Sequence, residues 1–409
     1  MDRKRVVGAA LLVAGTDIGA GMLVMPLVTG LVGFFPAMAL FVVMWLLMLW
    51  CADLVVETTL AVSSGGQREI NLVRMARLTL GRVGEWLTWG GFLLLFYTLV
   101  AAYMVGSGKL LSETIQGYRG WSLPTWGLPL PILLLCAPAV WIGFDTAARL
   151  NRWLMAGFAT AFAAMLSVVL PLMQPTRLLH ADGRYAWACL AIIVTGFAYH
   201  VVVPSLVHYL RGDVRSIRVS IMVGSLIPLV VYMLWELVVL AAVPVDGANG
   251  LADLLHRDLP LAAALREDEA ARNAMTVFAL LAVMTSFLGI STGLLDFLRD
   301  GLGIHNRMIA LGWTFVPPLV LIWTSRSAFV TILEYGGIFV ALLHGILPPA
   351  MVLALRSNKT LTDGCRPYHA WGGRGVMITA VVAFACFIAL VLAKNVGWFV
   401  LDLSPYLPT

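Results

Sequence analysis

Charged residues are scarce in this chain. Asp, Glu, Lys and Arg make up 12% of the 409 residues, whereas 60% are hydrophobic, and a soluble globular protein has about twice that charged fraction. Apolar stretches such as 34–52 and 275–295 are long enough to cross the hydrocarbon core of a bilayer. Because these stretches are continuous and do not alternate at every second residue, they exclude a β-barrel. The sequence therefore predicts an all-α polytopic membrane protein embedded in a lipid bilayer.

Several functional motifs are also missing. The five cysteines lack metal-ligand spacing, so neither a metal site nor a cofactor is expected. The chain has no phosphate-binding loop of an ATP-driven pump, and no His-Glu-x-x-His motif or nucleophile elbow of an enzyme. No basic run with interleaved aromatics indicates nucleic-acid binding, although the net charge is +5. Rings of like charge, typical of an ion channel, are absent as well.

The apolar segments predict eleven transmembrane helices in one membrane domain, 1–409. The only sizeable loop, about 244–270, is expected to hold a short surface helix around 250–265. The predicted spans are approximately 6–31, 34–63, 83–112, 128–144, 152–172, 185–210, 217–243, 271–298, 308–324, 329–355 and 375–392.

The loop charges predict the orientation. If the N-terminus is cytoplasmic, eighteen of the 27 Lys and Arg residues lie on the cytoplasmic side and eight on the other, as the positive-inside rule requires. The N-terminus, MDRKR, precedes a helix without a small-residue cleavage site, so we expect a retained first span and no signal peptide. Eleven spans then place the C-terminus in the periplasm.

Two predicted spans carry signals of interruption. Residues 14–22 read AGTDIGAGM, with three glycines and Asp17 inside the first span. Gly15 and Gly19 also form a GxxxG pair, which is typical of close helix packing. The sixth span has Gly196 and Pro204 on either side of His200. Unwound backbone at membrane depth is tolerated where it is buried in protein or faces water, so the two interruptions together favour a polar cavity.

Spans one and six are the first spans of two five-span halves, about 6–172 and 185–355, with 375–392 as an extra C-terminal helix. Interrupted segments at corresponding positions of two halves are typical of a transporter site at the interface of an inverted repeat. At such breaks, half-helix amino ends can hold a carboxylate and carbonyl ends an ammonium or an alkali cation. A zwitterionic amino acid fits that arrangement.

Four stretches, AGTDIGAGMLVMPL, GFAYHVVVPSLVHYL, YMLWELVVL and TSFLGISTGLLDFLRDGL, resemble the hydroxy and aromatic amino acid permeases, the bacterial tyrosine and tryptophan permease group. The resemblance implies a LeuT-type 5+5 inverted repeat with discontinuous helices 1 and 6. It also implies a proton-coupled importer of an aromatic amino acid in the bacterial inner membrane. That family usually has a small or hydroxyl residue at the position of Asp17, and FGFH in place of the sequence at 197–200.

Substrate-binding residues are expected at the two breaks and on the aromatic positions of spans three and six. They are Gly15, Thr16, Ile18, Gly19, Ala20, Gly21, Tyr97, Thr195, Gly196, Phe197 and Tyr199. Phe197 adjoins the second break, and stacking on a ring substrate would add about 1 kcal/mol beyond the burial of its area.

Ion or proton coupling is predicted for Asp17, His200, Thr285 and Ser286. An ionisable residue inside a span is functional by default, although an Asp can also cap a half-helix. His200 titrates near neutrality, or it is a satisfied interior histidine. In sodium-coupled relatives of the fold, a pair of hydroxyls on span eight forms the sodium site. Ser291 and Thr292 are a second candidate pair here, and either pair can also bond to its own helix.

Three carboxylates, Glu57, Glu236 and Asp296, are expected to be buried and to act in a gate or a structural charge network. Lys109 is expected to extend toward the interface without a functional role. The leading hypothesis is import of tyrosine or tryptophan by proton symport. A sodium-coupled or non-aromatic neutral amino acid transporter is the alternative, and an ion channel is a more remote one.

Overall fold

The computed structural model of this chain describes residues 3–63, 70–325, 329–358, 368–398 and 401–407. Regular structure in these residues consists of helices alone. The α-helices are α1 Arg3–Asp17, α2 Met25–Val32, α3 Phe34–Val62, α4 Leu72–Arg119, α5 Leu130–Ile142, α6 Phe144–Val169, α7 Ala186–Thr195, α8 Val203–Tyr209, α9 Val214–Ala242, α10 Leu251–His256, α11 Glu269–Leu302, α12 Arg307–Ser325, α13 Phe329–Val340, α14 Leu347–Ser357 and α15 Arg374–Asn395. Shorter 3-10 turns are η1 Ala20–Leu23, η2 Thr125–Gly127, η3 Leu170–Leu172, η4 Pro175–Leu179, η5 Gly183–Tyr185, η6 Tyr199–Val202 and η7 Leu261–Leu265, and η8 Ala341–Ile346 is a π-helix.

Ten helical segments in the described part of the chain are long and apolar enough to cross a membrane. They correspond to the second through eleventh predicted spans. The first predicted span is not among them; residues 3–32 are divided into α1, η1 and α2. The membrane-protein class predicted from composition is confirmed.

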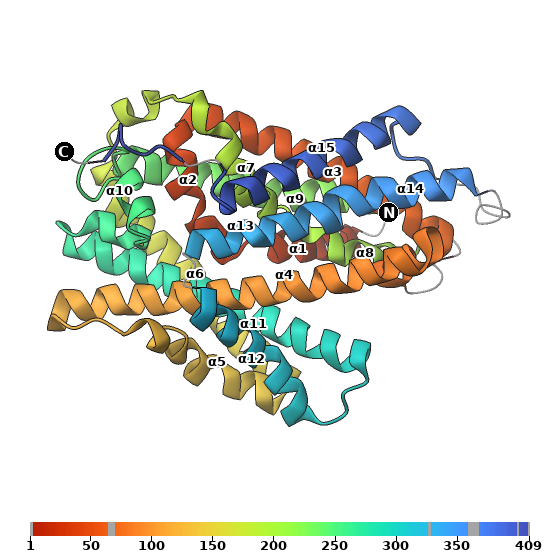
Figure 1. The fold of residues 1–409 in the computed structure, drawn as a ribbon, viewed down its shortest axis with the longest axis horizontal. Helices are drawn as coiled ribbons and strands as arrows, with labels where there is room; N and C mark the ends of the chain where they lie inside the picture. Colours follow the sequence, from red (N-terminus) through yellow and green to blue (C-terminus); the bar gives the residue numbers. More distant parts are fainter. Residues whose placement is uncertain (1–2, 64–69, 326–328, 359–367, 399–400, 408–409) are drawn as a thin grey trace.

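The longest element, α4, crosses the whole molecule in Figure 1. Its first turn is capped by the Asn71 side chain, which accepts a hydrogen bond from the Arg74 N–H at 2.9 Å. A sharp bend occurs at Gly81, where φ is 73° and ψ is −157°, a conformation that only glycine adopts readily. The predicted third span, 83–112, is the part after this bend.

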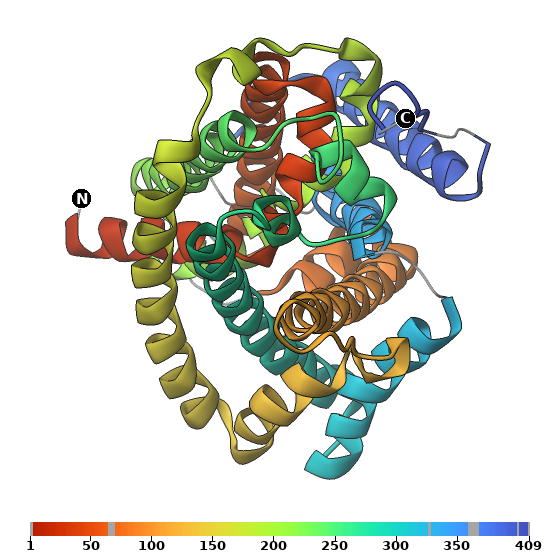
Figure 2. The same cartoon turned by 90° about the vertical axis from the view of Figure 1, so that its left-hand side faces the viewer.

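Helices of the two predicted halves, 6–172 and 185–355, pack against one another in a recurring pattern. From the first half, α1 lies against α9 and α6 lies against α11 of the second half. From the second half, α7 and α8 lie against α3, and α13 lies against α4 of the first half. The second set of contacts is the first set with the two predicted halves exchanged. Figure 2 shows α6 at the edge of the bundle and α4 near its centre.

The loop at 244–268 does not form the expected surface helix. It folds into α10 and η7, whose apolar side chains are buried, including Leu251 and Leu254 at 0% exposure. α10 packs against α2, and η7 packs against the start of α11. The sequence indicated a surface element because its many acids are polar, but Leu and Ala side chains between the acids pack into the bundle.

The C-terminal residues 401–407 lie against the same end of the molecule. Tyr406 donates a hydrogen bond to Asp182 at 2.8 Å and its carbonyl accepts one from Gly247 at 3.2 Å. Hydrogen bonding to the Arg184 guanidinium lowers the pKa of the Asp182 carboxyl, whereas burial and the bond to Asp182 raise the pKa of Tyr406 to about 12. The C-terminus is therefore close to the loop before α7 and the loop before α10.

Candidate functional site

Both expected interruptions are present. α1 ends at Asp17, and Gly19 has an extended backbone before η1 and α2 begin. α7 ends at Thr195, and residues 196–198 separate it from η6 and α8. In each case a proline, Pro26 or Pro204, occupies the first turn of the helix after the break. Proline suits that position because it has no N–H to leave unpaired and its φ is already helical.

The first break is held by span eight. The N–H of Ala20, at the start of η1, donates to the Ser286 hydroxyl oxygen at 2.9 Å. A Cβ at Gly19 would lie 2.7 Å from the same oxygen, closer than side-chain atoms approach one another. Glycine at this position therefore allows α11 to come close enough to bind the broken backbone. Thr285, the neighbouring hydroxyl, donates to the Ala282 carbonyl of its own helix at 2.9 Å.

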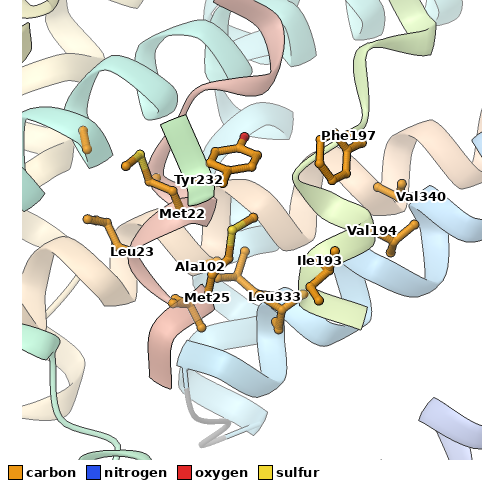
Figure 3. Packing of buried hydrophobic residues seen from close by; sticks show 14 of the residues in the cluster. Met22, Leu23, Met25, Ala102, Ile193, Val194, Phe197, Tyr232, Leu333 and Val340 are labelled. Atoms are coloured by element: carbon orange, nitrogen blue, oxygen red, sulfur yellow. The ribbon is translucent and has the colours of Figure 1, made fainter. Parts of the chain in front are cut away.

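A tyrosine of α9 connects the two breaks. The Tyr232 hydroxyl lies 2.6 Å from the Asp17 carbonyl oxygen and 3.1 Å from the Gly196 carbonyl oxygen. Its ring leaves no room for a side chain at Gly196, because a Cβ there would lie 3.0 Å from Cε2 of Tyr232. In Figure 3 the Tyr232 ring lies between the ribbon that carries Met22 and the ribbon that carries Phe197. One hydroxyl proton is thus shared between the carbonyl ends of α1 and α7.

The same face of α9 makes two more contacts with the first span. The Trp235 indole N–H donates to the Met22 carbonyl at 2.8 Å, and Glu236 accepts from the Thr29 hydroxyl at 2.8 Å. Sequence reasoning missed Tyr232 and Trp235. The available signal was their spacing with Glu236: positions i, i+3 and i+4 share one helix face and place three polar groups on it.

A cavity of about 340 Å³ lies between the breaks. This is within the range of roughly 300–1,000 Å³ found for small-molecule sites. Its walls come from spans one, three, five, six, seven, eight and ten. They are Gly15, Thr16, Asp17, Ile18, Gly19, Gly21, Phe92, Leu95, Phe96, Leu99, Tyr103, Asn151, Met155, Thr195, Gly196, Ala198, Val201, Tyr232, Thr285, Ser286, Gly289, Ile290, Leu333, Val340 and His344.

Most of the residues expected in a site line this cavity, and five do not. Ala20 uses its N–H on Ser286 and is buried behind the cavity wall. Phe197 is fully buried and packs edge-on against the Tyr232 ring, 5.8 Å away. Tyr199 and His200 are also fully buried outside the wall. Tyr97 is turned toward α12, where it donates to the Trp313 carbonyl at 2.9 Å.

Two of the expected aromatic residues, Tyr97 and Phe197, lie one position away from residues that line the cavity. On α4 the cavity side carries Phe92 and Phe96, whose rings lie 6.3 Å apart, and not Tyr97. At the second break it carries Gly196 and Ala198, and not Phe197. A shift of one residue turns a helical side chain by about 100°, and the sequence does not fix that rotation for a helix that is apolar all round.

Asp17 has an unusual environment. Its side chain is 8% exposed and lines the cavity. The carboxylate points toward the backbone N–H groups of Ala198 and Tyr199 at the second break, but neither oxygen has a hydrogen-bond partner within the described residues. A negative charge at the carboxyl end of α1 is unfavourable, whereas the amino end of η6 favours it. The two breaks thus place a carboxylate between a carbonyl end and an amino end.

The other charged residues lie away from the cavity. Glu57 is buried and accepts hydrogen bonds from the Arg356 guanidinium at 2.6 and 2.8 Å and from the Ala370 N–H at 2.8 Å. This ties α3 to α14 and to the segment before α15. Asp296, which we expected to be buried, is exposed, because its side of α11 points away from the bundle. Lys109 pairs with Asp258 in the loop at 244–268.

His200 and His344 form a contact that the sequence did not indicate. The His200 Nε2 lies 2.9 Å from the Met48 carbonyl oxygen, and its ring stacks on the ring of His344. His344 belongs to η8 and lines the cavity. It appeared in the sequence as a lone histidine in an apolar span, and nothing in its spacing connects it with His200.

Comparison with known proteins agrees with this architecture. A sequence profile described as the tryptophan/tyrosine permease family matches residues 2–392. The chain is 31% identical to a tyrosine-specific transport system 1 of Haemophilus influenzae, an alignment that covers 97% of this chain and 98% of that protein.

Two further relatives differ in their named substrates. A tryptophan-specific transport protein of Pseudomonas aeruginosa is 27% identical over 96% of this chain and 95% of its own length. A glutamine transporter 2 of Aliivibrio fischeri is 26% identical over 90% of this chain and 95% of its own length. Among solved structures, a manganese transporter of Eremococcus coleocola has the same fold, with a TM-score of 0.60, 14% identity and coverage of 97% of this chain and 88% of that chain.

Proposed function

The chain belongs to the tryptophan/tyrosine permease family, and we propose that it is a secondary active transporter that imports tyrosine or tryptophan by proton symport. This is a family of permeases and not of enzymes. The names of the tyrosine- and tryptophan-specific relatives support the substrate class. A multi-pass protein of such a family fits the inner membrane of a bacterium.

In the proposed topology the interrupted segment 3–32 crosses the membrane as an eleventh span. Residues 6–172 and 185–355 then form two inverted repeats, and 375–392 is an additional helix. The pairing of α1 with α9 and of α8 with α3 supports the repeat, as do the two prolines that begin α2 and α8. We place the N-terminus in the cytoplasm, and the C-terminus in the periplasm beside the loop at 244–268.

The substrate's charged groups would bind backbone at the first break. Its carboxylate lies against the amino end of η1. There the N–H groups of Gly19 and Gly21 are on either side of the Ala20 N–H, which donates to Ser286. Its ammonium lies between the carbonyl end of α1 and the Asp17 carboxylate, whose oxygens lack hydrogen-bond partners in the described residues. Thr16 and Thr195 lie at the polar end of the site, and Ile18 lines the cavity beside them.

The aromatic ring of the substrate would occupy the apolar end of the cavity. Phe92 and Phe96 of α4 form one wall, and Ile290 of α11 and Leu333 of α13 belong to the same lining. The two phenylalanine rings present faces and edges to a ring substrate, which favours aromatic over aliphatic side chains. In this proposal Phe96 has the role that was expected of Phe197 and Tyr97.

Proton coupling rests on the ionisable residues near the cavity. Asp17 lines it directly, and His200 lies one layer behind. The span-eight hydroxyls are engaged: Ser286 accepts a backbone N–H, and Thr285 donates to its own helix. Each hydroxyl oxygen keeps a lone pair in these contacts, so they do not exclude sodium, and the proton is proposed on the ionisable residues alone.

Alternating access requires that the cavity open to one side at a time. Gly15 and Thr16, at the end of the cavity nearest the N-terminal half of α1, are exposed. At the opposite end, α4 is tied to the loop at 244–268 by the Lys109–Asp258 pair, and Arg266 donates to Glu113 at 2.7 Å. With the N-terminus in the cytoplasm, this arrangement corresponds to a state that is open inward and closed outward.

The cavity between two broken helices is the observation that carries the proposal. We would test it by counterflow. Proteoliposomes that contain the protein are loaded with unlabelled tyrosine, and the entry of labelled tyrosine, tryptophan, phenylalanine and glutamine is followed. Imposed proton and sodium gradients are then applied separately. Exchange of tyrosine or tryptophan, with accumulation on the proton gradient, is the expected result.

The named substrate of the Aliivibrio fischeri relative makes a non-aromatic amino acid the second candidate. Exchange of glutamine without any aromatic amino acid would replace the proposed substrate class. Accumulation on a sodium gradient alone would replace the coupling ion and leave the substrate class intact.

A further inference from the structure

Two buried histidines from different spans are stacked beside the cavity. The rings of His200, in η6, and His344, in η8, have centroids 4.7 Å apart and planes inclined by 14°. The His200 ring also stacks on Tyr199, with centroids 4.8 Å apart. Exposure is 0% for His200 and 1% for His344. The pair therefore connects the second break with span ten inside the bundle.

The ring nitrogens of this pair are largely unpartnered. Among the described residues, neither nitrogen of His344 has a hydrogen-bond partner, nor does Nδ1 of His200. Only the Nε2 of His200 is bound, to the Met48 carbonyl. A buried polar atom left without a partner carries its full desolvation penalty, so it is rare in native proteins and calls for a functional explanation.

The position of His344 points to the cavity. It lines the wall beside Phe92, whose ring centroid is 6.2 Å away. It also lies in the π-helical segment Ala341–Ile346. Such segments are usually single wide turns inserted in an α-helix, and they occur frequently at functional sites. A change in this segment would move the His344 side chain relative to the cavity.

Stacked imidazoles of this kind are compatible with the neutral state. Because N–H bonds lie in the plane of each ring, two parallel rings cannot bond to one another. Two imidazolium charges at this separation repel, and each charge requires an acceptor. Asp17, which lines the same cavity with both carboxylate oxygens unpartnered, would attract a protonated His344 away from the stack.

Among the described residues, the carboxylates of the helices packed against η8 are paired elsewhere. Glu334 of α13 pairs with Lys394 of α15. Glu57 of α3 pairs with Arg356 of α14, and Asp53 of α3 accepts from Tyr368. Tyr103 of α4 lines the cavity as a neutral hydroxyl. Cys51 of α3 is buried. His200 is thus the ionisable side chain in direct contact with His344, and Asp17 is the carboxylate that shares its cavity.

We propose that His344 takes up the transported proton, and that its stacking on His200 restores the neutral state when the proton leaves. This inference rests on the proton symport proposed above. The proton binds a free ring nitrogen of neutral His344 from one side of the membrane, and the ring leaves the stack. Release to the other side lets the rings stack again. Opening and closing of the stack would couple the proton to a movement of span ten.

The test compares two transport modes of the same protein in proteoliposomes. Counterflow exchange needs substrate binding and alternating access but no net proton movement, whereas accumulation on a pH gradient also needs a proton site. We expect His344→Gln to keep tyrosine exchange and to lose accumulation. His305→Gln, an exposed histidine between α11 and α12, is the matched control and should keep both.

A second variant tests the role of the stack. His200→Gln removes the ring that holds His344 neutral, so accumulation should persist and its pH midpoint should move upward. If His344→Gln loses exchange as well, thermal stabilisation of the purified variant by tyrosine shows whether it is folded. His200→Gln then decides the proposal, and an unchanged pH midpoint of accumulation in His200→Gln contradicts the proposal.

The outcomes separate this inference from the proposed function. Wild-type protein that does not exchange aromatic amino acids refutes the proposed substrate class, and accumulation on sodium alone refutes proton coupling together with this inference. Wild-type protein that accumulates tyrosine on a proton gradient, with His344→Gln behaving identically, refutes only the assignment of His344.

Discussion

The two breaks in this protein interrupt the first and the sixth of the predicted spans, yet they are built differently. The first, at 18–19, lies in a glycine-rich segment that lines the cavity, and side chains from α9 and α11 hold it in place. The second, at 196–198, leads directly into Tyr199 and His200, whose rings are buried in the bundle. One break offers backbone groups, and the other offers titratable side chains.

The difference indicates a division of labour. Backbone N–H and carbonyl groups have a fixed charge distribution, so the first break suits recognition of a zwitterion at any pH. Imidazole changes its charge within the physiological range, so the second break suits response to protons. Asp17 belongs to the first break but faces the second, and it is the residue at which the two roles meet.

The largest effect is expected from neutralising Asp17. Asp17→Asn keeps the shape of the side chain and removes the charge that faces the substrate ammonium and the amino end of η6. We expect tyrosine uptake to fall by at least about tenfold, since a charge-assisted hydrogen bond contributes roughly 1.5–3 kcal/mol. Initial uptake rates at several pH values measure this.

Glu236→Gln is the matched control, because Glu236 is also a fully buried carboxyl but lies outside the cavity and accepts from Thr29. It should change uptake far less. Wild-type uptake by Asp17→Asn at every pH would remove Asp17 from the mechanism and with it the proposed link between the breaks.

A methyl group at Gly19 tests whether the first break depends on close approach of α11. Gly19→Ala places a Cβ 2.7 Å from the Ser286 oxygen, so we expect lower thermal stability and a loss of uptake. Overpacking of this kind costs about 1–3 kcal/mol. Gly15→Ala is the control in the same segment, because a Cβ there meets no atom within 4 Å. Equal thermal stability of the two variants would show that the Ser286 side chain moves aside without destabilising the protein.

Removing the Tyr232 hydroxyl tests the connection between the breaks. Tyr232→Phe leaves the Asp17 and Gly196 carbonyls without their shared donor, and a lost buried hydrogen bond costs roughly 1 kcal/mol. The expected result is a fall in the melting temperature of a few degrees and slower exchange. Tyr97→Phe removes a hydroxyl from a more exposed site and should have no comparable effect. If Tyr232→Phe and Tyr97→Phe have the same melting temperature, the two breaks do not depend on this contact.

The smallest effect concerns substrate preference. Phe96→Ala removes a ring from the cavity wall, whereas Phe197→Ala removes a buried ring outside it. We expect the preference for tyrosine over glutamine to fall several-fold in the first variant, corresponding to about 1 kcal/mol of ring contact. The second variant should lose stability and keep its preference. Competition of unlabelled amino acids against labelled tyrosine measures both, and a preference that changes only in Phe197→Ala would reverse the assignment.

Sequence reasoning located the site at the level of segments and failed at the level of side-chain direction. The glycines of 15–21, with Gly196 and Pro204, predicted both breaks because such residues are unfavourable inside a helix and serve a purpose where the chain must leave it. The choice between Phe96 and Tyr97 depends on helix rotation, which an apolar helix does not reveal. Burial of Asp296 was predicted from depth alone and was wrong, because depth does not say which side of α11 is covered.

The sequence by itself determined the membrane-protein class, ten of the predicted spans and the places where two helices break. These follow from local chemistry, namely long apolar runs, and glycine and proline where helices end. Only the tertiary structure decided which groups meet: Tyr232 between two carbonyls, Ser286 on Ala20, and His344 on His200. These partners are distant in the chain and carry no shared pattern, so their contact arises from how the helices pack and not from any one of them.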